Sequence, residues 1–317
     1  MSQRISILCT PDNNYVPYCG IMLTSLFENN KEEEIVVYIL CDHLNEKNIE
    51  DLSSLCRIYN KEIKFINLNK EIFDDCPIRE GDHVSIAAYY RLFAPQILPP
   101  DVKKILYLDC DIIINGNISN LYYTNIENYA FGAVVDEAHF MPRFYERLEY
   151  SNKYPYINSG VILFNLDYWR KNKTTEDCMR YISGNTDKII LHDQDTLNAV
   201  LHDKIKILPI TYNFQTGFMF TQFTNDYDEL VKKEINNCVY TPTIIHYTGS
   251  GKPWHKHAQH PYKKRFLYYR KKSLWCNFPL TRTREKFANK LRRWIVEIMW
   301  TLGIKKRIRI YIIKEQP

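Results

Sequence analysis

The first 70 residues alternate between short β-rich runs and longer segments of helical character, and this order limits the possible folds more than any other feature. The β-rich runs are residues 4–10, 34–42 and 63–69, and the helical segments between them are residues 18–28 and 45–60. Further β-rich runs follow at residues 104–115, 130–136 and 160–166, and a further helical segment at residues 193–201. A β-α-β-α-β order predicts an α/β fold in which helices cover a parallel sheet.

Length and cysteine usage set the outer limits. With 317 residues and 45% apolar content, the chain can form one large domain with an appendage, or two small domains. The nine cysteines are odd in number and contain no C-x-x-C pair, which favours free thiols in a reducing cytosol. We expect neither a signal peptide nor a membrane-spanning helix, because the sequence has no cleavage pattern and no apolar stretch of about 18 residues.

Two carboxylates two residues apart, Asp109 and Asp111, follow an apolar run. In an extended strand both side chains would project from one face and converge on a hard divalent cation, while Cys110 points into the core. Such oxygen ligands suit Mg²⁺ or Mn²⁺, which substrate phosphates commonly complete. The alternative is a pair of aspartates that only ends a buried strand at a turn.

Ligands of parallel α/β sheets bind beyond the carboxyl ends of the strands. This rule places the turn after the first strand, the Asp109–Asp111 pair and Asp136 at one edge. The sequence contains neither a G-x-G-x-x-G nor a Walker A loop, so it supports neither a standard dinucleotide site nor a P-loop.

Six motifs occur in a distinctive order along residues 4–256. They are TPDNNYVPYCGIMLTSL from Thr10, HVSIAAYYRL from His83, YLDCD from Tyr107, NSGVILFNL from Asn158, HDQDTLN from His192 and HYTGSGKPWH from His246. Together they resemble glycosyltransferase family 8, notably its bacterial lipooligosaccharide galactosyl- and glucosyltransferases. The resemblance implies a GT-A fold, which is Rossmann-like with a mixed sheet. It also implies a UDP-galactose or UDP-glucose donor, Mn²⁺, and transfer with retention of configuration.

The resemblance also implies roles for individual residues. The metal ligands would be Asp109, Asp111 and His246, with Mg²⁺ as the alternative ion. Gly249 and Lys252 follow His246 in a loop able to close over the diphosphate, where Lys252 adds positive charge. The residues implied in nucleoside binding are Thr10, Asp12, Asn14 and the backbone of Cys110. The implied donor-sugar residues are Arg91, Asp136, Asn158, Asp193 and Gln194.

The retaining mechanism leaves two routes open, a covalent intermediate on a carboxylate or attack from the face that UDP leaves. An amide is a poor nucleophile, so Gln194 favours same-face attack, whereas Asp193 is the candidate nucleophile of the other route. Asp195 is expected to cap or support the helix. His83 and Tyr15 are candidate acceptor contacts, with a loop histidine and a core tyrosine as the alternatives.

The C-terminal segment is strongly basic: residues 263–314 carry 17 Lys and Arg against two acidic residues. Residues 284–302 predict a helix with an apolar face of Phe287, Leu291, Trp294, Ile295, Ile298 and Leu302. A basic amphipathic helix with tryptophan favours adsorption to an anionic membrane surface. The alternative is packing on the body or on another protein, and no nucleic acid is expected. We therefore divide the chain into a catalytic domain, residues 1–262, and a membrane-associating tail, residues 263–317.

These observations predict a UDP-hexose-dependent hexosyltransferase that acts in the cytoplasm, peripherally on the inner face of the membrane. Its acceptor would be a bacterial surface glycan or glycolipid. Two alternatives from other classes are a nucleotidyltransferase on a similar fold and a noncatalytic sugar-nucleotide-binding or membrane-associated protein. Galactose and glucose differ at one hydroxyl, and the sequence leaves both open as donor sugars.

Overall fold

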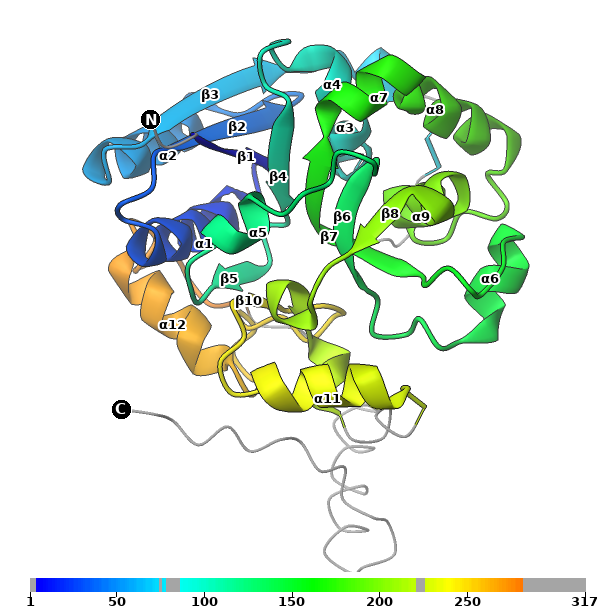
Figure 1. The fold of residues 1–317 in the computed structure, drawn as a ribbon. Helices are drawn as coiled ribbons and strands as arrows, with labels where there is room; N and C mark the ends of the chain where they lie inside the picture. The colour runs from blue at the N-terminus through cyan, green and yellow to red at the C-terminus, as the bar shows by residue number, and fades with distance from the viewer. Residues whose placement is uncertain (1–3, 74–75, 78–85, 221–225, 282–317) are drawn as a thin grey trace, which may run out of the picture.

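The computed structural model describes residues 4–73, 76–77, 86–220 and 226–281. Within these residues the strands form two sheets (Figure 1). The large sheet has the order β3-β2-β1-β4-β7-β6-β8, and the small sheet has the order β5-β10-β9. The strands of the large sheet are β1 (Ile5–Cys9), β2 (Ile35–Cys41), β3 (Glu62–Asn67), β4 (Lys104–Leu108), β6 (Phe131–Val135), β7 (Ile157–Asn165) and β8 (Ile205–Ile207). Those of the small sheet are β5 (Ile112–Ile114), β9 (Phe214–Gln215) and β10 (Ile244–His246).

The predicted alternation of strands and helices is confirmed, and the large sheet is mainly parallel. Strands β3, β2, β1 and β4 pair in parallel, as do β6 and β8. Strand β7 runs antiparallel between β4 and β6, so the sheet is mixed. Because β7 starts where β4 and β6 end, the N-terminal residues of β7 join the carboxyl ends of its neighbours at one edge.

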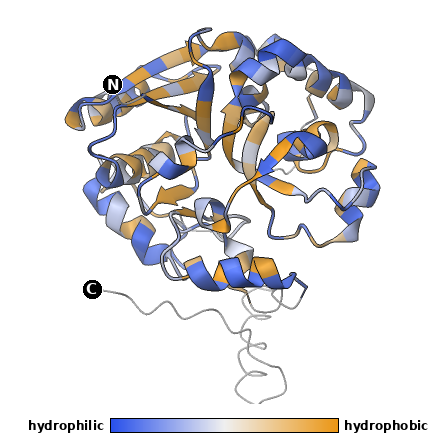
Figure 2. Ribbon diagram, viewed as in Figure 1, coloured by the Kyte–Doolittle hydropathy of each residue, from blue (hydrophilic) through white to orange (hydrophobic). Residues whose placement is uncertain are grey.

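Helices cover both faces of the large sheet, and β1, β2 and β6 are buried along their whole length and mainly apolar (Figure 2). One face packs against α1 (Val16–Asn29), α2 (Glu46–Ile58), α5 (Ser119–Tyr122), α11 (Glu229–Cys238), α12 (Lys263–Lys272) and the small sheet. The other packs against α3 (Ala87–Tyr90), α4 (Ala94–Ile97), α7 (Leu166–Asn172), α8 (Thr174–Gly184) and α9 (His192–Leu201). Helix α6 (Pro142–Leu148) belongs to a third, smaller cluster with Tyr150 and Tyr156.

The apolar run at residues 104–115 is not one strand, and this part of the prediction is wrong. It divides into β4 of the large sheet and β5 of the small sheet, with Cys110 and Asp111 in a turn between them. The two aspartates therefore do not converge by strand alternation. They converge because the chain turns sharply from one sheet into the other, while Cys110 packs against the core as expected.

The first part of the predicted tail packs on the body. Phe266 and Tyr269 of α12 are buried, and the ring of Trp275 lies against Gly20 of α1. A Cβ atom on Gly20 would come within 1.9 Å of that ring, so glycine permits the close approach. The helix predicted at residues 284–302 lies outside the described residues, as does His83. Among the described helices, none is both long and apolar enough to cross a membrane.

Candidate active site

Three potential metal ligands converge at the edge where β4 ends. Asp109 directly follows β4, Asp111 directly precedes β5, and His246 ends the neighbouring strand β10. One ligand atom from each lies within 4.8 Å of those of the other two. The Nε2 atom of His246 is 3.2 Å from Asp111 Oδ1 and 3.8 Å from Asp109 Oδ2. Two sheets thus bring together residues that are 137 positions apart in the sequence.

A contact behind the imidazole fixes which nitrogen faces the carboxylates. Nδ1 of His246 lies 2.9 Å from Oδ1 of Asn213, and the Asn213 amide nitrogen donates to Asn158 Oδ1 at 2.9 Å. With this amide orientation, Asn213 Oδ1 accepts a hydrogen bond from the Nδ1–H group, and Nε2 is the ring nitrogen that faces the two aspartates. A histidine ligand is oriented in this way at many metal sites.

Charge in this cluster is balanced by Lys252, whose ammonium group pairs with Asp111 and also donates to Tyr247 O at 2.7 Å. Burial raises the pKa of the Asp111 carboxyl, but Lys252 and His246 outweigh it and hold that pKa well below its usual range. Burial acts to lower the pKa of His246, but the negative charges of Asp111 and Asp109 have the larger effect, so this pKa is raised above its usual value. A positive charge is therefore favoured between these groups, which fits a divalent ion.

Arg91 lies buried beside this cluster and links it to α9. Its guanidinium contacts Asp109 Oδ1 at 3.2 Å and Asp193 Oδ2 at 3.3 Å, and donates to Ser159 O at 2.6 Å. It also stacks over the ring of Tyr107 at 3.8 Å, and the Tyr107 hydroxyl donates to Asp109 at 2.7 Å. Burial raises the pKa of Asp193 to about 6, even though Arg91 acts to lower it.

Gln194 occupies the centre of a buried polar network. Its Nε2 donates to Asp136 Oδ2 and to the Tyr156 hydroxyl, each at 3.2 Å. Its Oε1 accepts from Ser159 N at 3.0 Å and from Asn158 Nδ2 at 3.2 Å. Both ends of the amide are therefore bonded and its direction is fixed. These contacts bring together three of the predicted donor-sugar residues, Asp136, Asn158 and Gln194.

Asp195 supports this network from behind. It is fully buried and accepts two bonds from the Arg147 guanidinium, at 2.6 and 2.9 Å, and one from the Tyr156 hydroxyl at 2.6 Å. It also accepts the backbone N–H groups of Ile190 and Leu191, just before α9. Asp195 thus anchors the start of the helix, as predicted, and holds Tyr156 against Gln194.

Three of the four predicted nucleoside residues, Thr10, Asp12 and Asn14, lie on the loop between β1 and α1, and Cys110 lies in the turn between β4 and β5. Thr10 Oγ1 is 3.2 Å from the Tyr107 hydroxyl, which connects the loop to Asp109. The Asp12 carboxylate accepts the backbone N–H groups of Asn14 and Tyr15, so it also shapes the turn. Asn14 is exposed. Tyr15 packs edge-on against Trp254, at 6.2 Å between ring centroids.

A second set of contacts holds the loop that follows His246. Glu137, next to Asp136, accepts hydrogen bonds from the Thr248 hydroxyl at 2.9 Å and from the backbone N–H of Gly217. Gly249 has a φ of 74°, a conformation that favours glycine. The loop therefore connects the metal-ligand cluster to the Asp136 segment.

Comparisons with known proteins identify this arrangement. The model of the family described as "Glycosyl transferase family 8" matches residues 6–258. The chain belongs to glycosyltransferase family 8. It is 30% identical over 276 residues to General stress protein A of Bacillus subtilis (strain 168), covering 85% of this chain and 94% of that protein. It is also 30% identical over 284 residues to a lipopolysaccharide 1,2-glucosyltransferase of Escherichia coli, covering 88% of this chain and 81% of the relative.

The fold of this family 8 chain also matches solved structures. The galactosyltransferase LgtC, solved in complex with donor and acceptor sugar analogues, aligns with a TM-score of 0.78 and 24% identity. The alignment covers 85% of this chain and 96% of that chain. The predicted GT-A fold is confirmed.

Several residues of this family 8 site escaped the sequence analysis. Asn213, Tyr156 and Arg147 contact predicted residues that lie 33 to 55 positions away in the sequence. Glu137 contacts Thr248, 111 positions away, in the loop that follows His246. Each is a common residue type in an unremarkable segment, so no local pattern singles it out. Gly160 lies within a quoted motif, but its closeness to His246 depends on how the two sheets meet.

Proposed function

We propose that the chain is a retaining, Mn²⁺-dependent hexosyltransferase that transfers galactose or glucose from a UDP-sugar to a bacterial surface glycan or glycolipid. The observation that carries this proposal is the position of the Asp109, Asp111 and His246 cluster beside the polar network of Gln194, joined by Arg91. A cationic centre suits a diphosphate, and paired donors and acceptors suit sugar hydroxyls.

Asp109, Asp111 and His246 would hold the Mn²⁺, with Mg²⁺ as the alternative ion. Two carboxylates and an imidazole that turns its Nε2 toward them form a suitable donor set, because a neutral imidazole binds a metal through that nitrogen. When bound, the ion supplies positive charge against the negative charge that develops on the departing diphosphate. Lys252, already beside Asp111, adds charge at the same place.

The remaining residues would bind the donor. Thr10, Asp12, Asn14 and the backbone of Cys110 would contact the uridine, next to the Asp109 cluster. Arg91, Asp136, Asn158, Asp193 and Gln194 would contact the hexose. Gly249 lies in the loop that would cover the diphosphate.

The geometry favours attack by the acceptor from the face that UDP leaves. The anomeric carbon–oxygen bond to UDP breaks, the acceptor oxygen bonds to that carbon, and the acceptor proton passes to the departing phosphate. The fixed carbonyl oxygen of Gln194 would stabilise positive charge at the anomeric carbon. Asp193 is the alternative as a covalent nucleophile, and its pairing with Arg91 at 3.3 Å makes it a weaker one.

The acceptor class and the location of the enzyme are inferred from the relatives and from the C-terminal segment. Matched relatives act on lipopolysaccharide by name, which supports a glycan or glycolipid acceptor. The basic amphipathic segment at residues 284–302 would hold the enzyme on the inner face of the membrane, within the cytoplasm. Because residues 263–281 pack on the body, the segment to remove in a test begins at residue 282. Truncation there should release the protein from sedimented anionic vesicles while preserving UDP release, and a truncated form that still sediments contradicts the tail assignment.

UDP release tests the activity directly. The purified chain is incubated with Mn²⁺ and a panel of sugar nucleotides, beside an Asp109→Asn/Asp111→Asn variant. The exposed Asp101→Asn serves as a matched control. We expect release from one UDP-hexose that the control keeps and the double variant loses. UDP binding without release from any donor, with acceptor sugars also supplied, would instead support the noncatalytic alternative.

A further inference from the structure

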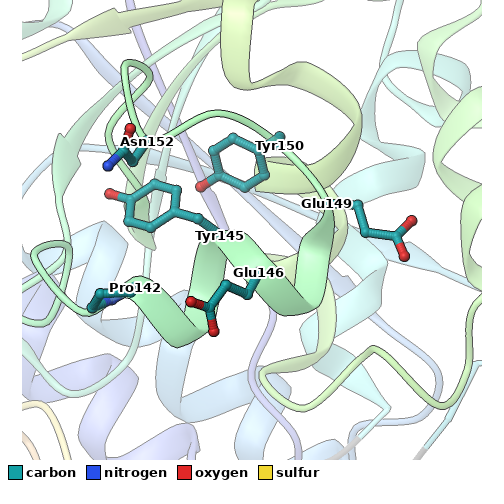
Figure 3. Close-up of a pocket in the computed structure, with 6 residues that line it drawn as sticks. All are labelled: Pro142, Tyr145, Glu146, Glu149, Tyr150 and Asn152. Carbon is teal, nitrogen blue, oxygen red and sulfur yellow. The ribbon is translucent and has the colours of Figure 1, made fainter.

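A hollow lies between helix α6 and the segment that follows it, apart from the residues proposed to bind the donor (Figure 3). Its volume is about 320 Å³, and its lining residues are Pro142, Tyr145, Glu146, Glu149, Tyr150 and Asn152. This volume is at the low end of the range for small-ligand pockets, which is about 300 to 1,000 Å³.

The hollow shares the edge of the sheet that carries the candidate active site. Helix α6 belongs to the connection from β6 to β7, which leaves the sheet after Val135 and returns to it at Ile157, beside Asp136 and Asn158. The Tyr145 hydroxyl accepts the backbone N–H of Tyr156 at 3.1 Å, and the side chain of Tyr156 contacts Gln194. One wall of the hollow is therefore bonded to a residue that holds the proposed catalytic amide.

Two tyrosines form the inner wall of the hollow, and their hydroxyl groups differ. The rings of Tyr145 and Tyr150 meet edge-on at 5.2 Å. Tyr145 uses its hydroxyl fully, because it also donates to His139 O. Tyr150 is only 9% exposed, and within the described residues its hydroxyl has no hydrogen-bond partner. Figure 3 shows this hydroxyl turned toward Tyr145, into the space between the two residues. A buried hydroxyl without a partner is unfavourable, and a ligand that pairs with it recovers that loss.

The other lining groups are those that a neutral sugar needs. Glu146 is exposed in the C-terminal half of α6, and Glu149 is exposed directly after the helix, where it forms an ion pair with Lys188 at 2.7 Å. Carboxylates accept hydrogen bonds from sugar hydroxyls, Asn152 can donate or accept, and tyrosine rings pack against the C–H faces of a pyranose. The exposed Glu146 carboxylate disfavours uronic acids and phosphorylated sugars by like-charge repulsion.

We propose that this hollow is a saccharide subsite, which binds one neutral hexose unit of the acceptor glycan away from the hydroxyl that is glycosylated. This inference rests on the proposed function, since it assigns the site to the acceptor of that reaction. An acceptor that reaches both the hollow and the Gln194 network is held at two points, so its reactive end is oriented before transfer.

Binding of simple sugars to the full chain, without donor, tests the subsite. The probes are methyl β-galactoside, methyl β-glucoside and galacturonic acid, followed by saturation-transfer NMR titration. The variants are Tyr150→Phe and Glu146→Gln, which keep the size of each side chain. The control is Glu127→Gln, because Glu127 is exposed and precedes β6 at the opposite edge of the sheet.

We expect a neutral hexoside to bind the wild type and the control equally, and each pocket variant about 3- to 10-fold more weakly, with galacturonic acid the weakest ligand. The unfolding temperature of Tyr150→Phe should not fall, because its hydroxyl contributes no hydrogen bond within the protein. Equal affinity in wild type and both pocket variants overturns the inference, as does preference for the acidic sugar. Because this assay needs no turnover, an inactive chain that binds hexosides as expected contradicts the proposed function alone.

Discussion

Gly160 lies so close to His246 that the imidazole occupies the place where any other side chain would begin. A Cβ atom on Gly160 would be 2.2 Å from His246 Cε1 and 2.8 Å from Asp109 Oδ2. Gly160 belongs to β7 of the large sheet and His246 to β10 of the small sheet. The absence of a side chain at this one position lets the two sheets bring the proposed metal ligands together.

Gly160→Ala should therefore damage the metal site more than the fold. The added methyl group overlaps the imidazole, which must move away from Asp109 and Asp111, so we expect Mn²⁺ affinity to fall by about 10- to 100-fold. Isothermal titration with Mn²⁺ and UDP release measure this effect. Gly184→Ala is the matched control, because a Cβ atom there meets nothing within 4 Å. Equal Mn²⁺ affinity in the two variants would show that the imidazole is not a ligand.

Tyr156→Phe tests whether the direction of the Gln194 amide matters for transfer. The change removes one acceptor from Gln194 Nε2 and one donor from Asp195, while the ring stays in place. A loosened amide should reduce kcat by about 10- to 100-fold and affect the donor KM less. The control is Tyr122→Phe, whose hydroxyl donates to Lys104 O far from this network. An unchanged kcat in Tyr156→Phe would contradict the proposed role of Gln194.

Arg147→Met should destabilise the protein strongly. The Arg147 side chain is 17% exposed and neutralises the fully buried Asp195 through two hydrogen bonds. Its removal leaves a buried carboxylate without its counter-charge, and we expect the free energy of unfolding to fall by about 3 kcal/mol. Urea denaturation provides the measurement, with the exposed Arg180→Met as the control. If adding Asp195→Asn to Arg147→Met recovers none of the loss, the buried charge is not its cause.

Stability should fall in acid because of His260. Burial, aided by the positive charge of Lys252, lowers the pKa of this histidine to about 3 from its usual 6.5. The unfolded chain therefore binds a proton between these values that the folded chain does not, and stability is lost as pH falls from about 6.5 toward 3. The slope from this group is at most about 1.4 kcal/mol per pH unit.

Chemical denaturation of His260→Gln at several pH values checks this dependence. The variant should show a shallower fall in unfolding free energy over the same range, whatever its stability at neutral pH. His257→Gln alters an exposed histidine and should keep the slope of the wild type. Identical slopes for wild type and His260→Gln would show that folding does not lower the pKa of His260.

The sequence predicted the fold where local patterns decide it. Apolar runs and the helices between them gave the parallel order of β1, β2 and β3, and the motifs gave the Asp109, Asp111 and His246 cluster. The break between β4 and β5 was missed because the run around Cys110 is apolar on both sides, and an Asp-Cys-Asp sequence fits a strand end as well as a turn. Only the pairing of β5 with β10, about 130 positions later, decides between them.

Local sequence patterns also could not predict the supporting residues of the site, because their contacts join segments that are distant in the sequence. Asn213 meets His246 because the two-residue strand β9 pairs with β10, and Arg147 meets Asp195 because α6 packs beside α9. Each contact depends on tertiary packing between distant segments. The tail prediction at residues 284–302 stays a prediction.

The turn at Cys110 and Asp111 joins two separately hydrogen-bonded sheets, and the proposed ligands come from both sides of it. Asp109 continues from the large sheet, whereas Asp111 and His246 border or belong to the small one. An ion bound by all three residues would link the large sheet to the small sheet. By thermodynamic linkage, any interaction that holds the two sheets in this alignment raises the affinity for the ion, and the bound ion in turn opposes separation of the sheets.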